Sequence, residues 1–247
     1  MVAAPAASDA VARARRLPGL RVGLHLVLVN GRPVLPPEQI PNLVGADGAF
    51  LGDLAGAGFR YFFSPAARAQ LRREIRAQFD AFRATGLALD HVNAHCHMQL
   101  HPTIGRMMLE IGQAYGMRAV RVPGEPDTVL RQAGGTAGER AFAAGHAPFA
   151  ALLRRRVRAA GLASNDRLLG LAWTGRMTEA RLLRLLDTLP DGVTEILLHP
   201  AAARTRPLVA AMPDYRQTEE LDALLSVAVR ARLASLGIAA GGYGDLA

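Results

Sequence analysis

The 247-residue chain is half hydrophobic and carries a formal net charge of +8. This length allows one large domain or two small ones and suits a single α/β barrel, and no apolar run is long enough for a membrane-spanning helix. Every basic residue is arginine, as a GC-rich coding bias would produce, and neither zinc-finger spacing nor an aromatic RNA-binding signature is present, so no nucleic-acid partner is expected. One cysteine allows no intramolecular disulfide and, with the lack of a signal-peptide pattern, predicts a cytoplasmic protein.

Helical and strand patterns alternate along most of the chain, which is typical of a parallel sheet with helical crossovers. No repeat or linker divides the sequence, so we expect one domain spanning residues 1–247. The pattern predicts strands over residues 21–29, 87–95, 118–122, 167–175, 192–200 and 237–243. It predicts helices over residues 10–17, 64–85, 102–115, 149–162, 178–188 and 218–236.

Two stretches lack a regular pattern. Residues 30–58 contain several prolines and glycines directly after a strand, which is typical of a lid or binding loop. The glycine-rich residues 134–140 are weak evidence for phosphate binding, because no clear strand precedes them, and we expect a flexible loop. By contrast, Ser64 as N-cap, Pro65 in the first helical turn and Gly86 after the last turn define clear helix boundaries.

Histidines at strand ends are the candidate functional residues. His25 lies within a predicted strand, His199 ends another, and His95 lies at the end of a third. In parallel α/β folds, ligands and catalytic groups collect at the C-terminal edge of the strands. A single histidine such as His25 can equally be a core residue that one neighbour satisfies.

Four of the seven histidines fall within residues 91–101. Imidazole is a common ligand of divalent metals, and His95 and His97 would face one site if both lay on a strand. The alternative is a loop with incidental polar residues. Cys96 could act as a nucleophile only with an oriented base. A strand would point it away from both histidines, so a core or supporting thiol is the preferred interpretation.

Four motifs follow one another along the chain: GLHLVLVNGRPVLPPEQIPNLVGADGAF, HVNAHCHMQLHP, RVPGE and TEILLHPA. Together they resemble the successive motifs of the YdjC/ChbG family of carbohydrate deacetylases, and the resemblance covers essentially the whole chain. NGRPVLPPEQIPNLV and HVNAH resemble HpnK, the hopanoid-associated branch. The resemblance implies a distorted (β/α) barrel that removes the N-acetyl group from an acetylated amino sugar, with an N-acetylglucosaminyl hopanoid lipid as the substrate.

The resemblance also implies roles for individual residues. His25 and His95 match two ligands of a divalent metal ion, Mg or Zn, which would activate water and polarise the acetyl carbonyl. His199 matches the acid that protonates the departing amine. The positions assigned to substrate binding are Arg121, Glu125 and His97.

The sequence departs from the family pattern in two places. The family begins with a strand ending in Asp-Asp-Phe-Gly, which supplies a carboxylate ligand and a carboxylate base, whereas Asp9 is the only acidic residue before His25. The opening MVAAP resembles the family's second strand, so the first strand is expected to be missing. Gln99 replaces a further histidine, which we expect to change a contact around the site. Two histidines alone hold a metal weakly, so the alternative is a catalytically inactive protein of the same fold that binds a sugar or a lipid headgroup.

Two more interpretations stay open. An unrelated barrel-type metal-dependent hydrolase would need a carboxylate near the histidines, and Asp90 is the obvious candidate. Residues 149–162 form a basic amphipathic helix, which either lies on an anionic membrane surface or is an ordinary outer helix. A lipid-linked substrate predicts contact with the periphery of the inner membrane, and a homo-oligomer is a further expectation.

Overall fold

The computed structural model describes residues 1–246. The contacts within the chain divide it into two compact units, which are described separately below. Unit 1 comprises Met1–Val122, Phe149–Ser164 and Gly242–Ala247, and unit 2 comprises Pro123–Pro148 and Asn165–Gly241.

Parallel extended segments form the centre of unit 1. Strand β1 (Leu24–Leu26) pairs with β2 (Val92–Ala94), and His25 lies opposite Asn93 in the register. Single parallel bridges continue this arrangement from Val92 to Val120 and from Ala119 to Ala163. The alternation of strands and helices therefore does give parallel pairing, as the sequence predicts.

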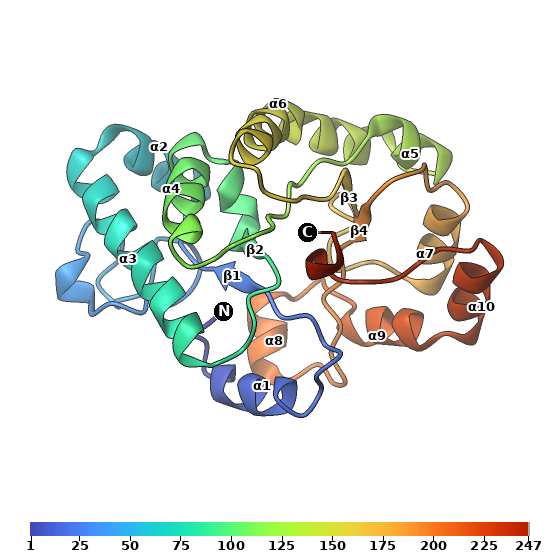
Figure 1. Ribbon diagram of the computed structural model, residues 1–247, viewed down its shortest axis with the longest axis horizontal. Coiled ribbons are helices and arrows are strands. Elements are labelled where there is room, and N and C mark those ends of the chain that lie inside the picture. The colour runs from blue at the N-terminus through green and yellow to red at the C-terminus, as the bar shows by residue number, and fades with distance from the viewer. Residues whose placement is uncertain (247) are drawn as a thin grey trace. The chain divides into compact units, whose positions relative to one another are not determined.

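Figure 1 shows α3 and α4 close to β1 and β2, and α2 packs against α3 and α4. The segment α6 belongs to both units, with its residues from 149 onward in unit 1. The helical segments are α1 (Ala7–Ala14), η1 (Pro37–Gln39), α2 (Leu54–Phe63), α3 (Pro65–Ala84), η2 (His95–Leu100), α4 (Pro102–Gln113), α6 (Ala137–Ala159) and η3 (Tyr243–Asp245).

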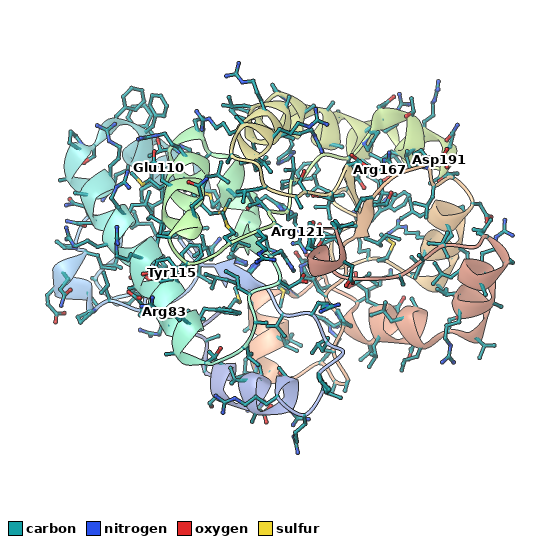
Figure 2. All side chains as sticks on the ribbon, in the orientation of Figure 1. Arg83, Glu110, Tyr115, Arg121, Arg167 and Asp191 are labelled. Atoms are coloured by element: carbon teal, nitrogen blue, oxygen red, sulfur yellow. The ribbon has the colours of Figure 1, made fainter. Side chains whose placement is uncertain are left out.

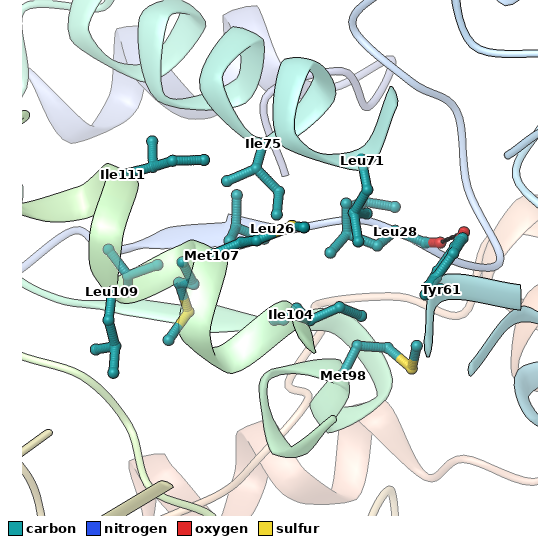
Figure 3. Packing of buried hydrophobic residues seen from close by; sticks show 14 of the residues in the cluster. Leu26, Leu28, Tyr61, Leu71, Ile75, Met98, Ile104, Met107, Leu109 and Ile111 are labelled. Carbon is teal, nitrogen blue, oxygen red and sulfur yellow. Dashed lines mark hydrogen bonds between the residues drawn. The ribbon is translucent and has the colours of Figure 1, made fainter. Parts of the chain in front are cut away.

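Apolar side chains fix β1 between the helices of unit 1. Leu26 and Leu28 are fully buried, and Figure 3 shows them between Ile75 of α3 and Ile104 of α4. Burying each such side chain stabilises the fold by about 1.5–3 kcal/mol. The Tyr61 hydroxyl donates to the carbonyl oxygen of Leu28 at 2.8 Å. Because alternate residues of a strand face opposite sides, this packing directs His25 away from the core that its neighbours enter.

Three polar side chains on α3, spaced four residues apart, are buried against the irregular residues 27–42. We call Gln70, Glu74 and Gln78 the α3 polar stripe. They satisfy backbone groups that have no partner in regular secondary structure. Gln78 accepts from the amide of Val27 at 2.9 Å and donates to its carbonyl at 2.7 Å, Glu74 accepts from the amides of Val34 and Leu35 at 2.8 and 3.0 Å, and Gln70 accepts from the amide of Asn42 at 2.8 Å.

Unit 2 is built around a second parallel pair, β3 (Arg167–Leu169) and β4 (Thr194–Ile196). Arg167, marked in Figure 2, donates to the carbonyl oxygens of Pro190 and Asp191 at 3.0 and 2.8 Å, which ties the loop before β4 to β3. The remaining helices are α5 (Asp127–Gln132), α7 (Glu179–Leu186), α8 (Arg206–Ala211), α9 (Gln217–Leu225) and α10 (Val227–Ser235). A separate core surrounds the buried Trp173 and Met177.

Several predicted elements are confirmed, although the strands are shorter than predicted. The predicted helices at residues 64–85, 102–115 and 178–188 correspond to α3, α4 and α7. Residues 1–6 form turns instead of the strand that MVAAP resembles. Among residues 1–246 the named strands form two pairs and no closed sheet, so the distorted barrel stays a prediction while the α/β class is confirmed.

Other predictions are wrong for identifiable local reasons. Residues 218–236 do not form one helix, because Ser226 adopts a ψ of 131° between α9 and α10 and caps α10 by accepting from the amide of Val229. Residues 237–243 form no strand, and residues 118–122 form only the single bridges described above. The predicted loop at 30–58 contains the start of α2, and the predicted glycine-rich loop at 134–140 contains the start of α6.

Candidate functional site

Two of the predicted site residues lie side by side in unit 1. His25 is in the middle of β1, and His95 directly follows β2. Nε2 of His25 lies 3.5 Å from Nδ1 of His95, and the two rings meet edge to face with centroids 5.6 Å apart. The pair arises because β1 and β2 are neighbouring parallel strands.

The turn after β2 differs from the prediction and changes the place of His97. Residues 95–97 do not continue the strand, because Cys96 and His97 have left-handed backbone angles, with φ of 50° and 53°. Gln99 supports this turn by accepting from the amide of Ala94 at 3.0 Å. His95 and His97 therefore do not share a strand face, and that prediction is wrong. Gln99 does act as a supporting contact next to the site.

Cys96 is exposed, so the interpretation as a core thiol is also wrong. Partial desolvation raises the pKa of its thiol, and the side chain amide of Asn30 lies 4.0 Å from its sulfur. An activated cysteine needs a lowered pKa and an oriented base. Its environment therefore gives no support to a nucleophilic role.

A chain of polar contacts extends from His25 through β2. Nδ1 of His25 lies 2.5 Å from Oδ1 of Asn93, and Nδ2 of Asn93 lies 3.4 Å from Nε2 of His91. Nδ1 of His91 in turn lies 2.9 Å from Oδ2 of Asp90. Asn93 has no distinguishing pattern in the sequence, and only the register of the parallel pair places it opposite His25.

Asp90 belongs to this chain but not to the histidine pair. Its carboxylate accepts from the backbone amides of Tyr243 and Gly244 at 3.2 and 2.8 Å, besides its contact with His91. Burial alone would raise the pKa of Asp90, but these hydrogen bonds outweigh burial and lower it. Among residues 1–246 no three His, Cys, Asp or Glu side chains are arranged to hold a metal ion, so Asp90 does not complete a site with the histidines, as an unrelated metal-dependent hydrolase would need.

The histidine pair is electrically neutral near pH 7. Burial lowers the pKa of His25 to about 3 despite the opposing hydrogen bond with Asn93, and the positive charges of the Met1 amino group and Arg121 act in the same direction as burial. Burial also lowers the pKa of His95. Neutral imidazoles can accept a proton or bind a cation, which a protonated ring cannot.

The residues around the pair only partly fit the divalent metal that the family resemblance implies. Among residues 1–246 no group of three or more His, Cys, Asp and Glu side chains is arranged to hold a metal ion. His25 and His95 supply two imidazole nitrogens, and the charges acting on His25 are positive. A catalytic zinc site has three protein ligands and a magnesium site needs carboxylates. The described donor set therefore does not make a complete site.

Arg121, which is labelled in Figure 2, lies beside Asn93 in unit 1. Nη1 and Nη2 of its guanidinium group lie 3.1 and 3.3 Å from one terminal atom of the Asn93 amide. Arg121 is thus within reach of the histidine pair through one side chain, while its predicted contact with substrate stays a prediction.

Glu125 and His199 belong to unit 2, and each is held by backbone contacts there. Both oxygens of Glu125 accept from backbone amides, Gly170 at 2.6 Å and Ala172 at 2.8 Å, and burial raises its pKa. These bonds give Glu125 a structural task, which is to shape the turn after β3. Its predicted role in substrate binding stays a prediction.

The backbone amide of His199 donates to Glu220 of α9, whose other oxygen accepts from the amide of Met177 at 2.9 Å. The His199 ring lies edge to face with Tyr215, with centroids 5.2 Å apart. Sequence reasoning missed Glu220, because a glutamate in an amphipathic helix is usually exposed, whereas this one is fully buried. Its role as an anchor depends on a contact 21 residues away along the chain.

Comparison with known proteins supports the family resemblance. The model of the YdjC-like protein family matches residues 1–235. A carbohydrate deacetylase from Mus musculus is 32% identical over 258 residues, covering 94% of this chain and 80% of the mouse protein. The carbohydrate deacetylase from Homo sapiens is also 32% identical, covering 94% of this chain and 77% of the human protein.

A solved structure supports the fold. The crystal structure of a proposed cellobiose-phosphate cleavage protein from Enterococcus faecalis superposes with a TM-score of 0.73, covering 100% of this chain and 86% of that chain at 21% identity. At this identity the likeness shows the fold alone. The match to the family model and the similarity to the two relatives show that the chain belongs to the YdjC-like protein family.

Proposed function

We propose that this protein is a carbohydrate deacetylase, a hydrolase that removes the N-acetyl group from an acetylated amino sugar. The observation that carries the proposal is the neutral His25–His95 pair at neighbouring parallel strands, in a chain whose relatives are named carbohydrate deacetylases. Functional groups in parallel α/β folds collect at this edge of the strands.

The proposed chemistry is hydrolysis of an amide by water. Because burial lowers the pKa of both rings, His25 and His95 are proposed to contribute neutral nitrogen ligands, while the guanidinium of Arg121 offers a positive charge to the developing oxyanion. His199 is proposed as the acid that returns a proton to the departing amine. A divalent cation, Mg or Zn, would polarise the acetyl carbonyl when bound. The described residues do not form a complete metal site, and metal dependence is therefore proposed and tested below.

The proposed substrate is an N-acetylglucosaminyl group linked to a hopanoid lipid. The support is the resemblance of residues 30–44 and of the HVNAH motif to the hopanoid-associated branch. Such a substrate would place the protein at the cytoplasmic periphery of the inner membrane. A free N-acetylated oligosaccharide is the competing substrate, and both are tested below.

The experiment measures acetate released by the purified chain from N-acetylglucosamine oligosaccharides and from a lipid-linked N-acetylglucosaminyl substrate, with added Mg²⁺, Zn²⁺ or chelator. We expect His25→Ala and His95→Ala to reduce release at least 100-fold. His146→Ala is the matched control, because the ring of His146 contacts Phe142, one turn earlier on α6, through its carbonyl oxygen and its ring.

The outcomes separate the two candidate functions. Acetate release that the histidine variants abolish and the control retains supports the deacetylase. Binding of either sugar without acetate release, under every metal condition, would instead identify the inactive sugar- or headgroup-binding protein.

A further inference from the structure

We propose that Arg121 sets the position of the proton on His25, by fixing the orientation of the Asn93 amide. The side chains of all three residues belong to unit 1, and Asn93 lies between the other two. Asn93 and Arg121 are therefore positioning residues for His25. The inference does not require the proposed activity, because the proton on His25 can be located without substrate.

The Asn93 amide has two orientations with different partners. In the first, Oδ1 faces Nδ1 of His25 at 2.5 Å and Nδ2 faces Nε2 of His91 at 3.4 Å. The amide NH₂ then also faces the guanidinium of Arg121, so donors oppose donors. In the second, rotated by 180°, Nδ2 donates to Nδ1 of His25 at 2.5 Å, and Oδ1 accepts from Nη1 and Nη2 of Arg121 at 3.1 and 3.3 Å.

The second orientation is the stronger of the two. It replaces a facing pair of donors by two hydrogen bonds from a charged group, and such bonds are about twice as strong as neutral ones. What it gives up is the 3.4 Å contact with His91, which is long for a hydrogen bond. Arginine keeps its charge at any accessible pH, so this preference is permanent.

The orientation decides which ring nitrogen of His25 carries the proton. When Asn93 donates to Nδ1, that nitrogen has no hydrogen, and the neutral ring carries its proton on Nε2. Nε2 then points this hydrogen toward Nδ1 of His95, 3.5 Å away. A nitrogen that carries a proton cannot bind a cation. Metal ligands among histidines usually hold the opposite tautomer, with the non-ligating nitrogen donating to an acceptor.

With its proton on Nε2, His25 cannot offer that nitrogen to a metal ion, and two substitutions should move the proton to Nδ1. Replacing Asn93 by Asp gives an acceptor for both neighbours, so Nδ1 of His25 must donate and Nε2 becomes free. Replacing Arg121 by Met removes the charged donors, so the amide can return to the first orientation with the same result at His25. The two changes differ in charge and size but predict the same shift of the proton.

The experiment is ¹⁵N–¹H correlation NMR of the histidine rings in the full chain labelled with ¹⁵N-histidine, with the His25 signals assigned by their absence in His25→Gln. We expect protonated Nε2 in the wild-type protein and protonated Nδ1 in Asn93→Asp and Arg121→Met. Arg118→Met, an exposed arginine on the same segment, is the matched control and should keep the wild-type pattern.

Zinc alone, titrated calorimetrically, gives the second readout. Changes in groups that support metal ligands alter affinity about 10–100-fold. We expect Arg121→Met to bind Zn²⁺ at least tenfold more tightly than wild type and Arg118→Met to be unchanged. Protonated Nδ1 in the wild-type protein would overturn the inference without any variant, and an unchanged tautomer in a folded Arg121→Met protein would remove Arg121 from it.

Discussion

Buried glutamates anchor this chain at the scale of single residues. Glu74, Glu125 and Glu220 are all buried, and each accepts two backbone amides from a segment distant in sequence. Burial raises the pKa of all three carboxyl groups. In each case, hydrogen bonds with backbone amides offset the unfavourable desolvation of the carboxylate and position a loop.

We expect Glu74→Gln to lower the free energy of unfolding by about 1–3 kcal/mol at pH 4.5, because one amide NH₂ would face a backbone donor. The deficit should shrink as pH rises. The folded chain holds the Glu74 proton more tightly than the unfolded chain, whose carboxyl titrates near 4.5, so wild-type stability from this group is lost as pH rises through the raised pKa. Urea unfolding of both proteins between pH 4.5 and 8 measures this difference in the free energy of unfolding. A difference that grows with pH would contradict the prediction.

The residues of the site were predictable from sequence to different degrees. His25 and His95 could be chosen as candidates because a histidine within or just after an apolar strand pattern can be recognised in the sequence alone. Asn93 was overlooked, since it is ordinary until the strand register places it opposite His25. The prediction that His97 shares a strand face with His95 is wrong, because Cys96 and His97 form a left-handed turn and no glycine in the sequence indicates it.

Helix caps decide much of the structure at the scale of elements. Ser64 accepts from the amide of Ala67 at 3.2 Å and begins α3, and Gly86 follows α3 with a φ of 70°. Such signals are local, which is why the sequence predicts α3 correctly. The break at Ser226 was missed because the apolar pattern continues across it, and α2 was missed because its glycines hide a helix that Asp53 caps.

Ser64→Ala tests the cap of α3. We expect it to reduce the free energy of unfolding by about 1 kcal/mol, because the amide of Ala67 loses its acceptor. Ser64→Asp keeps an acceptor at this position and should stay within a few tenths of a kcal/mol of wild type. Thermal and urea unfolding of the three proteins compare them, and an equal loss in both variants would show that the hydroxyl has another task.

Charge is the dominant property at the scale of the whole molecule. The chain carries 29 basic and 21 acidic residues, and a basic surface attracts anionic lipid. In α6, however, Leu153 and Val157 are buried in the core of unit 1, while Phe149 is 48% exposed. This burial favours the ordinary outer helix over one that lies in a bilayer. No helix among residues 1–246 has the length and hydropathy needed to cross a membrane.

We therefore expect binding to anionic vesicles to be electrostatic and weak. Vesicles with phosphatidylglycerol should retain the chain at about 20 mM salt and release it at about 300 mM, where screening is strong over a few ångströms. Replacing Arg155 and Arg158, both exposed, by Gln should weaken retention several-fold. Phe149→Ala is the control and should change little, whereas a loss of binding that salt does not reproduce would reveal insertion of that side chain.

The parallel α/β class followed from the alternation of helix and strand patterns, which is a property of the whole sequence. Closure of a barrel cannot be deduced from this alternation, because it depends on pairings between strands far apart in the chain. The strands are only three residues long, so many extended residues, such as Val120 and Ala163, take part through single bridges. Periodicity over so few residues carries little information on where a strand ends.

The α3 polar stripe should slow the amide hydrogen exchange of the irregular residues 27–42. Amides in a segment without regular structure commonly exchange with solvent deuterium within seconds to minutes, yet those of Val27, Val34 and Leu35 are bonded to buried side chains of a helix. Their exchange should follow the opening of α3 itself. The amide of Ala49, bonded to the exposed Asp47, should exchange quickly. Deuterium uptake of the amides of Val27, Val34 and Leu35 should therefore be as slow as that of α3, whose side chains accept their hydrogen bonds.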